Sequence, residues 1–173
     1  AKQLADMVIV LPHWGTEYVY TPDSNQNYWT QLFLSLGVDV VIGTHPHVLE
    51  PVEVVSDTKG HEMLVYYSLG NFVSNQDQKP RMIGGMAKMT LVKDETGCYV
   101  KNYNLTPVIT QKLFGPKAIT TYKLSDYTES LASGNAIRND SGCSDFSLSY
   151  CQTLVKQILG DDYDESTSEL NVS

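Results

Sequence analysis

The sequence predicts a mixed α/β fold, and three observations lead to that class. The apolar run DMVIVLP at 6–12 ends at a proline and is typical of a strand buried on both faces. A second apolar run, VDVVIG at 38–43, has the same character. From residue 50 onward, strand-like segments are separated by short polar turns, which is typical of antiparallel hairpins.

The stretch between the two apolar runs predicts a helix over 21–37. Asp23 or Ser24 can cap its start, apolar residues recur at helical spacing, and Gly37 ends it. A strand, a helix and a second strand in succession form a βαβ unit. We therefore expect the two apolar runs to be parallel neighbours in one sheet, joined by a right-handed crossover.

The rest of the chain divides into a hairpin region and a tail. Two antiparallel hairpins are predicted, from 50–55 with 63–69 and from 84–94 with 98–110. Residues 1–123 are expected to form the main domain. Residues 124–173 are expected to add a helical extension, with helices within 124–133 and 145–160, and to end in a frayed acidic tail.

Composition excludes some classes of function. The 173 residues carry 12 basic and 20 acidic side chains, a net charge of −8. Because nucleic-acid binding depends on clustered Lys and Arg, we expect no nucleic-acid partner. Cys98, Cys143 and Cys151 fit no zinc motif and are expected to be free thiols, although Cys143 and Cys151 could form a bridge across a turn. The opening AKQLAD is typical of the end of a helix, so we expect a piece of a longer chain.

Three of the four histidines follow the two apolar runs. His13 comes after the first run, and His45 and His47 come after the second. Parallel neighbouring strands place their carboxyl ends on one edge of a sheet, where open α/β sheets bind ligands. We therefore expect PHWGTE at 12–17 and GTHPH at 43–47 to face each other. His61, in the turn of the first hairpin, is expected to be structural.

The HPH triplet predicts two imidazoles on one side of the chain. Pro46 biases His45 toward extended backbone, and in extended backbone residues i and i+2 point the same way. The three imidazoles could therefore hold a divalent metal together, with His13 from one loop and His45 and His47 from the other. The alternative is that these histidines are satisfied by hydrogen bonds and have packing or surface roles.

Other side chains near this edge are further candidates. Glu17 could act with His13 as a catalytic acid or base, ligate a metal, or remain solvated. Trp14 is expected to pack or to form a pocket wall. Asn71, which follows a predicted strand and a glycine, could cap a turn or bind a ligand oxygen. Arg81 could bind an anion or point into solvent.

Three segments together resemble the CapA family of bacterial capsule and poly-γ-glutamate synthesis proteins, which is similar in fold to calcineurin-like metallophosphoesterases. The segments are ADMVIVLPHWGTEY at 5–18, GVDVVIGTHPHVLEPVE at 37–53 and YSLGNFVSNQ at 67–76, in that order. The resemblance covers residues 1–110. It implies the C-terminal part of a four-layer αββα sandwich with mixed sheets, and a site for divalent metal ions such as Mn, Fe or Zn at the strand ends.

The resemblance also implies roles for particular residues. His13, His45 and His47 match metal-ligating histidines of the wider superfamily. Asn71, Arg81 and Trp14 are the candidates for binding substrate. The family's Gly-Asp and Asn-Asn-His motifs, which supply a bridging carboxylate and further ligands, do not occur in this sequence. We therefore expect an incomplete site, completed by the rest of the protein or by a second protomer, and little or no phosphatase activity from this chain alone.

Three functional hypotheses follow. The first is a metal-dependent hydrolase acting on a phosphoester or on an amide of an anionic capsule polymer, with His13 and Glu17 moving protons. The second is a non-catalytic accessory protein of polymer synthesis or export, working with membrane proteins of the capsule machinery. The third is a fold whose histidines no longer function. The resemblance further implies a place outside the cytoplasmic membrane, behind an N-terminal membrane anchor.

Overall fold

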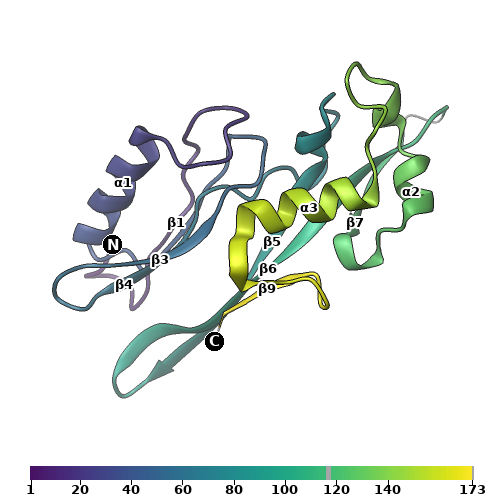
Figure 1. Cartoon of the computed structure of the whole chain (residues 1–173). Coiled ribbons are helices and arrows are strands. Elements are labelled where there is room, and N and C mark those ends of the chain that lie inside the picture. Colours follow the sequence, from purple (N-terminus) through teal and green to yellow (C-terminus); the bar gives the residue numbers. More distant parts are fainter. Residues whose placement is uncertain (116–117, 173) are drawn as a thin grey trace.

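The computed structural model describes residues 1–115 and 118–172 and contains two β-sheets with helices packed against them (Figure 1). The first sheet has the strand order β1-β2-β4-β3. Its strands are β1 (Ile9–Val10), β2 (Val40–Ile42), β3 (Val52–Ser56) and β4 (Glu62–Tyr66). β1 pairs parallel with β2, β2 pairs parallel with β4, and β3 pairs antiparallel with β4. The mixed α/β class, the parallel strands and the first hairpin are therefore confirmed.

The two apolar runs differ in burial. Val40 and Val41 of β2 are fully buried, as expected for a strand covered on both faces. β1 is only two residues long, and its Ile9 is 43% exposed. β1 is an edge strand of the sheet, so the expectation of a fully buried strand over 6–12 is wrong.

Helix α1 (Ser24–Ser35) connects β1 to β2, as predicted. Asp23 and Gln26 form a capping box. The Gln26 backbone amide donates to the Asp23 carboxylate at 2.8 Å, and the Asp23 amide donates to the Gln26 side-chain oxygen at 3.0 Å. The helix ends at Ser35 with Leu36 as its C-cap, and Gly37 follows with φ at 74°, a conformation that glycine adopts without steric cost.

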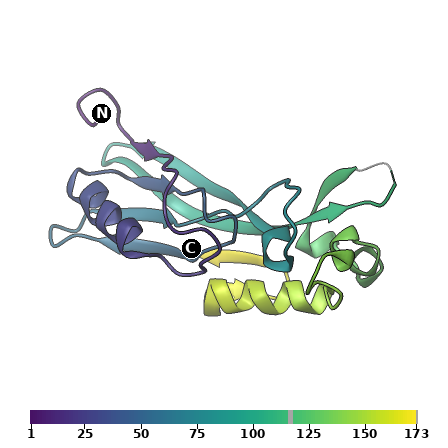
Figure 2. The ribbon, with the colours of Figure 1, turned by 90° about the horizontal axis from the view of Figure 1, so that it is seen from above.

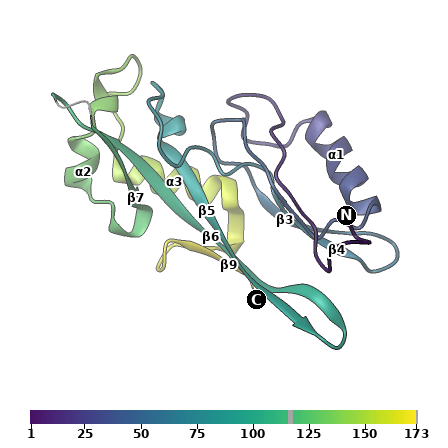
Figure 3. The same cartoon turned by 180° about the vertical axis from the view of Figure 1, so that it is seen from behind.

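The second sheet is built around β6. Its strands are β5 (Ile83–Asp94), β6 (Gly97–Lys112), β7 (Ile119–Lys123), β8 (Tyr163–Asp164) and β9 (Glu169–Val172). β6 pairs with β5, β7 and β9, and β8 pairs with β9. The β5–β6 hairpin is the second predicted hairpin, and its tip projects away from the rest of the molecule (Figure 3). β7 was not predicted.

The C-terminal region contains α2 (Glu129–Ser133) and α3 (Leu148–Leu159), which agree with the two predicted helices. The described residues of this region also include the short 3-10 segments η2 (Leu124–Asp126), η3 (Ala136–Asn139) and η4 (Gly160–Asp162), and a further one, η1 (Lys79–Met82), precedes β5. Where a frayed acidic tail was expected, β8 and β9 instead form a hairpin on β6. Tyr163 and Leu170 are buried in the core and hold this hairpin in place.

Hydrophobic clusters lie on both faces of the first sheet. One face packs on α1 through Val41, Val65 and Tyr67. The other face contributes a second set of side chains, Val40, Leu64 and Tyr66, to a cluster shared with the second sheet and with α3. Figure 2 shows α1 beside the strands of the first sheet and α3 beside β9. The order of these elements is compatible with the expected class, while the four-layer sandwich stays a prediction.

Two further findings concern the cysteines and the helices. All three cysteines are free, and Cys143 and Cys151 are buried thiols. In the described part of the chain, no helix is both long enough and apolar enough to cross a lipid bilayer.

Candidate functional site

The carboxyl ends of β1 and β2 meet at one edge of the first sheet, as predicted. His13 forms an isolated parallel bridge with Thr44, beyond the ends of both strands. The Tyr18 amide donates to the Pro46 carbonyl at 2.8 Å. We refer to residues 13–18 and 44–47, with Asn71 and Arg81, as the histidine edge.

A row of side chains runs along the histidine edge from His13 to Arg81. The ring centroids of His13 and His45 are 4.5 Å apart, and those of His45 and His47 are 6.4 Å apart. Tyr18 stacks on His47 with centroids 6.2 Å apart, and the guanidinium carbon of Arg81 lies 3.6 Å from the centre of the Tyr18 ring. The edge therefore brings three imidazoles, a phenol and a guanidinium together.

The backbone of the edge is unusual. The φ angles are 109° at His45, 60° at His47 and 68° at Tyr18, a region that non-glycine residues rarely adopt. The predicted extended backbone at His45 is therefore wrong. Hydrogen bonds to the Pro46 and His47 carbonyls, from Tyr18 and Asn71, hold this loop in a conformation that local sequence preferences disfavour.

Trp14 belongs to the histidine edge by sequence, but its side chain lies in the core. It is 6% exposed, and its indole nitrogen donates to the Tyr67 carbonyl at 2.9 Å. A Cβ atom at Gly43 would lie 2.0 Å from the Tyr67 carbonyl oxygen and 2.4 Å from the indole nitrogen. The glycine is therefore needed for this contact, and the indole is used in packing rather than presented to a ligand.

Asn71 connects three parts of the chain. Its side-chain nitrogen donates to the His47 carbonyl at 3.1 Å and to the Arg81 carbonyl at 3.0 Å. Its side-chain oxygen lies 2.9 Å from Nδ1 of His47. The amide, expected to bind a ligand or to cap a turn, is thus engaged by the protein itself.

Glu17 and Arg81 supply the charges of the edge. An oxygen of Glu17 lies 4.0 Å from Nε2 of His47, and both side chains are partly open to solvent. Arg81 donates to Asp77 at 2.9 Å and to Gln76 at 3.1 Å through the same nitrogen. A carboxylate therefore lies near Nε2 of His47, and the guanidinium of Arg81 lies on the Tyr18 ring that stacks on the same imidazole.

The donor set fits a metal ion only in part. Imidazole nitrogens and a carboxylate are suitable ligands for Zn, Fe or Mn. Within residues 1–115 and 118–172, however, no group of three or more His, Cys, Asp or Glu side chains is placed so that it could hold a metal ion. These residues do not form a complete metal site by themselves, and ligation by His13, His45 and His47 stays a prediction.

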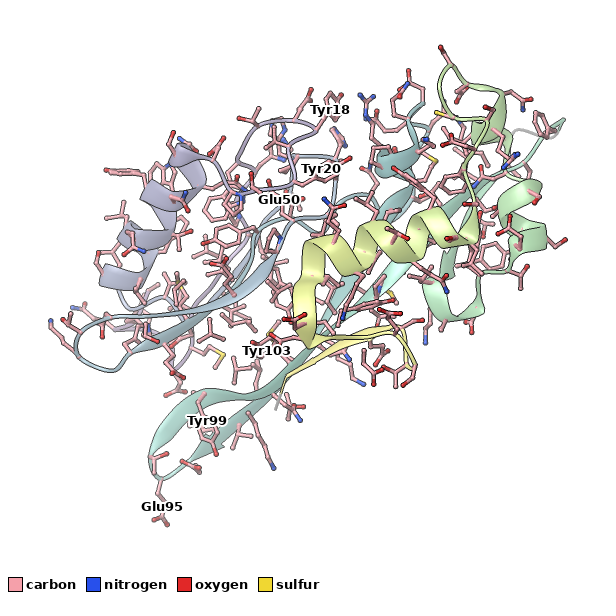
Figure 4. The ribbon with its side chains drawn as sticks, in the orientation of Figure 1. Tyr18, Tyr20, Glu50, Glu95, Tyr99 and Tyr103 are labelled. Atoms are coloured by element: carbon pink, nitrogen blue, oxygen red, sulfur yellow. The ribbon has the colours of Figure 1, made fainter. Side chains whose placement is uncertain are left out.

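Glu50 is a buried acid that the sequence analysis missed. Its side chain lies in the interior of the molecule (Figure 4) and is fully buried. Nε2 of Gln26 donates to its Oε2 atom at 2.6 Å. Its other oxygen, Oε1, has no hydrogen-bond partner in the described part of the chain. Burial raises the pKa of Glu50 to about 7; the Gln26 hydrogen bond opposes this rise, and the negative charge of Asp23 adds to it. The only hint of this burial in the sequence was that Glu50 directly follows the apolar pair Val48 and Leu49.

The fold and the site together define an α/β protein with a histidine-lined edge at the ends of parallel strands. Residues 1–76 match the profile of the family described as "Bacterial capsule synthesis protein PGA_cap". The predicted relationship to the CapA family is therefore confirmed. All residues of the histidine edge except Arg81 lie within this match.

Two curated relatives extend the comparison. The PGA biosynthesis protein CapA of Bacillus subtilis (strain 168) is 37% identical over 108 residues, which cover 62% of this chain and 26% of the relative. The capsule biosynthesis protein CapA of Bacillus anthracis is 39% identical over 75 residues, which cover 43% of this chain and 17% of the relative. The matches thus span about a quarter or less of the length of each relative.

Proposed function

We propose that this chain takes part in the synthesis of a capsule polymer of the poly-γ-glutamate type, outside the cytoplasmic membrane and in a membrane-anchored protein. The names of both relatives support the process. The single observation that carries the proposal is the histidine edge, because nearly all of it comes from the segment that matches the capsule family. A functional site drawn from that segment is expected to serve the family's process.

As a finer proposal, the edge performs a hydrolytic step on a phosphoester or on an amide of an anionic polymer. Imidazoles change protonation near neutral pH and are suited to acid–base catalysis. His47 and Glu17 lie 4.0 Å apart and could pass a proton between them. Arg81 could bind the anionic group of the substrate. The four-layer sandwich of metallophosphoesterases is proposed as the fold of the whole protein.

The finer proposal includes a divalent metal whose ligands come only in part from this chain. Mn, Fe or Zn bound near His13, His45 and His47 would supply an activated water. The remaining donors would come from other parts of the protein or from a second protomer. The residues that the structure describes do not complete such a site, so no step of the proposed reaction is assigned to the metal.

The first test is polymer production. A Bacillus subtilis strain that lacks its CapA protein would express the protein that carries this chain, either unchanged or with His45→Ala. The unchanged protein should restore polymer, and His45→Ala should reduce production at least tenfold. His61→Gln is the matched control, because His61 lies outside the edge, in the turn between β3 and β4.

Two outcomes would count against the proposal. Failure of the unchanged protein to restore polymer would contradict the proposed role in capsule-polymer synthesis. Full restoration by His45→Ala would contradict the hydrolytic step and favour a non-catalytic accessory role in synthesis or export. Elemental analysis for bound Mn, Fe and Zn in the same two proteins tests the metal: equal contents would remove the metal from the proposal.

A further inference from the structure

We propose that Asn71 is a positioning residue that holds His47 in its Nδ1–H tautomer, so that the unprotonated Nε2 faces Glu17 and the open side of the edge. The proposal deepens the proposed function, because it names the nitrogen through which His47 would act. It rests on two observations, the orientation of the Asn71 amide and the close approach of the chain segments around it; the position of Glu17 shows what Nε2 faces.

Two backbone carbonyls fix the orientation of the Asn71 amide. The carbonyls of His47 and Arg81 can only accept hydrogen bonds, and both lie near the same Asn71 side-chain atom, at 3.1 and 3.0 Å. That atom must therefore be the NH2 nitrogen, which has two hydrogens to donate. Turning the amide over would bring its oxygen against both carbonyls and lose both hydrogen bonds.

The orientation of the amide then determines the tautomer of the imidazole. With its nitrogen on the two carbonyls, Asn71 presents its oxygen to Nδ1 of His47 at 2.9 Å. A side-chain oxygen only accepts, so Nδ1 must carry the hydrogen. A neutral imidazole has one ring hydrogen, and Nε2 is left with a free electron pair.

The backbone around Asn71 is held closely enough to keep this arrangement. Gly70 has φ at 60°, and a Cβ atom there would lie 2.7 Å from the Ile83 carbonyl oxygen. A Cβ atom at Gly84 would lie 2.2 Å from the Asn71 carbonyl oxygen. Glycine at both positions lets the chain segments approach closely and confines Asn71 between them.

The unprotonated Nε2 of His47 faces the side of the histidine edge where Glu17 lies. Nε2 lies 4.0 Å from a carboxylate oxygen of Glu17, and the His47 ring is stacked on Tyr18. In this tautomer Nε2 can accept a proton or bind a cation. In the opposite tautomer Nε2 would carry a hydrogen and could do neither, so Asn71 selects the functional form.

The test is the nitrogen NMR spectrum of the ring in this 173-residue chain, labelled with 15N and recorded at a pH where imidazoles are neutral. An unprotonated ring nitrogen resonates far downfield from a protonated one, so the tautomer is read directly. His61 is an internal control: its Nε2 lies 2.8 Å from the Val38 carbonyl, so it must be the Nε2–H tautomer. We expect His47 and His61 to show opposite patterns in one spectrum.

Two variants extend the test. Asn71→Ala should shift His47 toward the Nε2–H tautomer that free histidine prefers, with His61 unchanged. Asn71→Asp keeps an acceptor for Nδ1 and should restore Nδ1–H, which a merely structural role would not predict. Its second oxygen would meet the His47 and Arg81 carbonyls in place of the NH2 group, so this variant should unfold at a lower urea concentration than the unchanged chain. An Nε2–H pattern for His47 in the unchanged chain would overturn the proposal, and so would an Nδ1–H pattern that persists in folded Asn71→Ala. This readout does not depend on polymer production, so it can fail while the proposed function stands, and the reverse.

Discussion

The loops that follow β1 and β2 both carry histidines to the same edge, but they are built differently. In the loop after β2, Pro46, Val48, Leu49 and Glu50 are all buried. In the loop after β1, residues 11–20, Trp14 alone is buried. The loop after β2 is therefore part of the core, whereas the loop after β1 lies on its surface.

Backbone hydrogen bonds attach the exposed loop to the buried one. The Trp14 amide donates to the Thr44 carbonyl at 3.1 Å, and the Tyr18 amide donates to the Pro46 carbonyl at 2.8 Å. The buried loop therefore sets the geometry of the edge, and the exposed loop follows it. A change in the buried loop should therefore disturb both loops, and a change in the exposed loop should have only local effects.

The largest effect is expected from Gly43→Ala, at the start of the buried loop. The new methyl group would meet the Tyr67 carbonyl at 2.0 Å, and backbone cannot move aside as a flexible side chain can. We expect the free energy of unfolding to fall by about 3 kcal/mol or more. Urea denaturation measures this loss.

Gly60→Ala is the matched control for that change. Unlike Gly43, Gly60 has a positive φ, 86°, and a methyl group there would meet nothing within 4 Å. Its cost should be about 1 kcal/mol, from the backbone conformation alone. Equal losses for the two alanines would show that Gly43 is not needed for close packing under the edge.

The second effect concerns pH and the buried Glu50. Its pKa is about 7 in the folded chain against an ordinary value of 4.5, so between these values the folded state binds more protons than the unfolded state. The contribution of protonated Glu50 to the free energy of unfolding is complete below about pH 4.5 and is lost as the pH rises to about 7. The loss amounts to about 3 kcal/mol at most. Glu50→Gln, which is neutral at every pH, should remove this slope from urea midpoints measured across that range.

The control for Glu50→Gln is Glu95→Gln at the exposed tip of the β5–β6 hairpin. It changes one carboxylate in the same way but outside the core, and the slope should persist in it. If the pH dependence of stability persisted in Glu50→Gln, it would have to come from other groups. That result would weaken the view of the loop after β2 as a buried unit.

The smallest effect is expected in the exposed loop. Tyr18→Leu removes the ring that stacks between Arg81 and His47, and exposed cation–π contacts contribute only modestly. We expect a loss of about 1 kcal/mol in urea denaturation. Tyr18→Phe keeps the ring and should be close to neutral. A loss as large as that of Gly43→Ala would mean that the exposed loop also determines the fold.

Much of the fold could be predicted because it depends on local patterns. The helix after β1 has its cap at Asp23 and its end near Gly37, and both hairpins are marked by polar turns. The meeting of His13 with the loop after β2 followed from parallel pairing alone. These features need no knowledge of distant contacts.

The features that were missed depend on partners far apart in the sequence. The positive φ angle of His47 is held by Asn71, which comes 24 residues later. The burial of Glu50 requires Gln26, and the C-terminal hairpin requires β6. In that acidic tail Tyr163 and Leu170 pointed to a place in the core, and the charge around them concealed this signal. Amino-acid composition and the spacing of apolar residues along the chain cannot reveal such pairings.

The position of β4 between β2 and β3 has a consequence for how the chain folds. β4 must align along β2 before the segment that ends in Asn71 can reach the loop of His47. A growing chain that has reached only residue 50 would contain all three histidines of the edge without the residue that orients one of them. Because contacts distant in sequence form slowly, the histidines are expected to acquire their final arrangement late, after the first hairpin has docked.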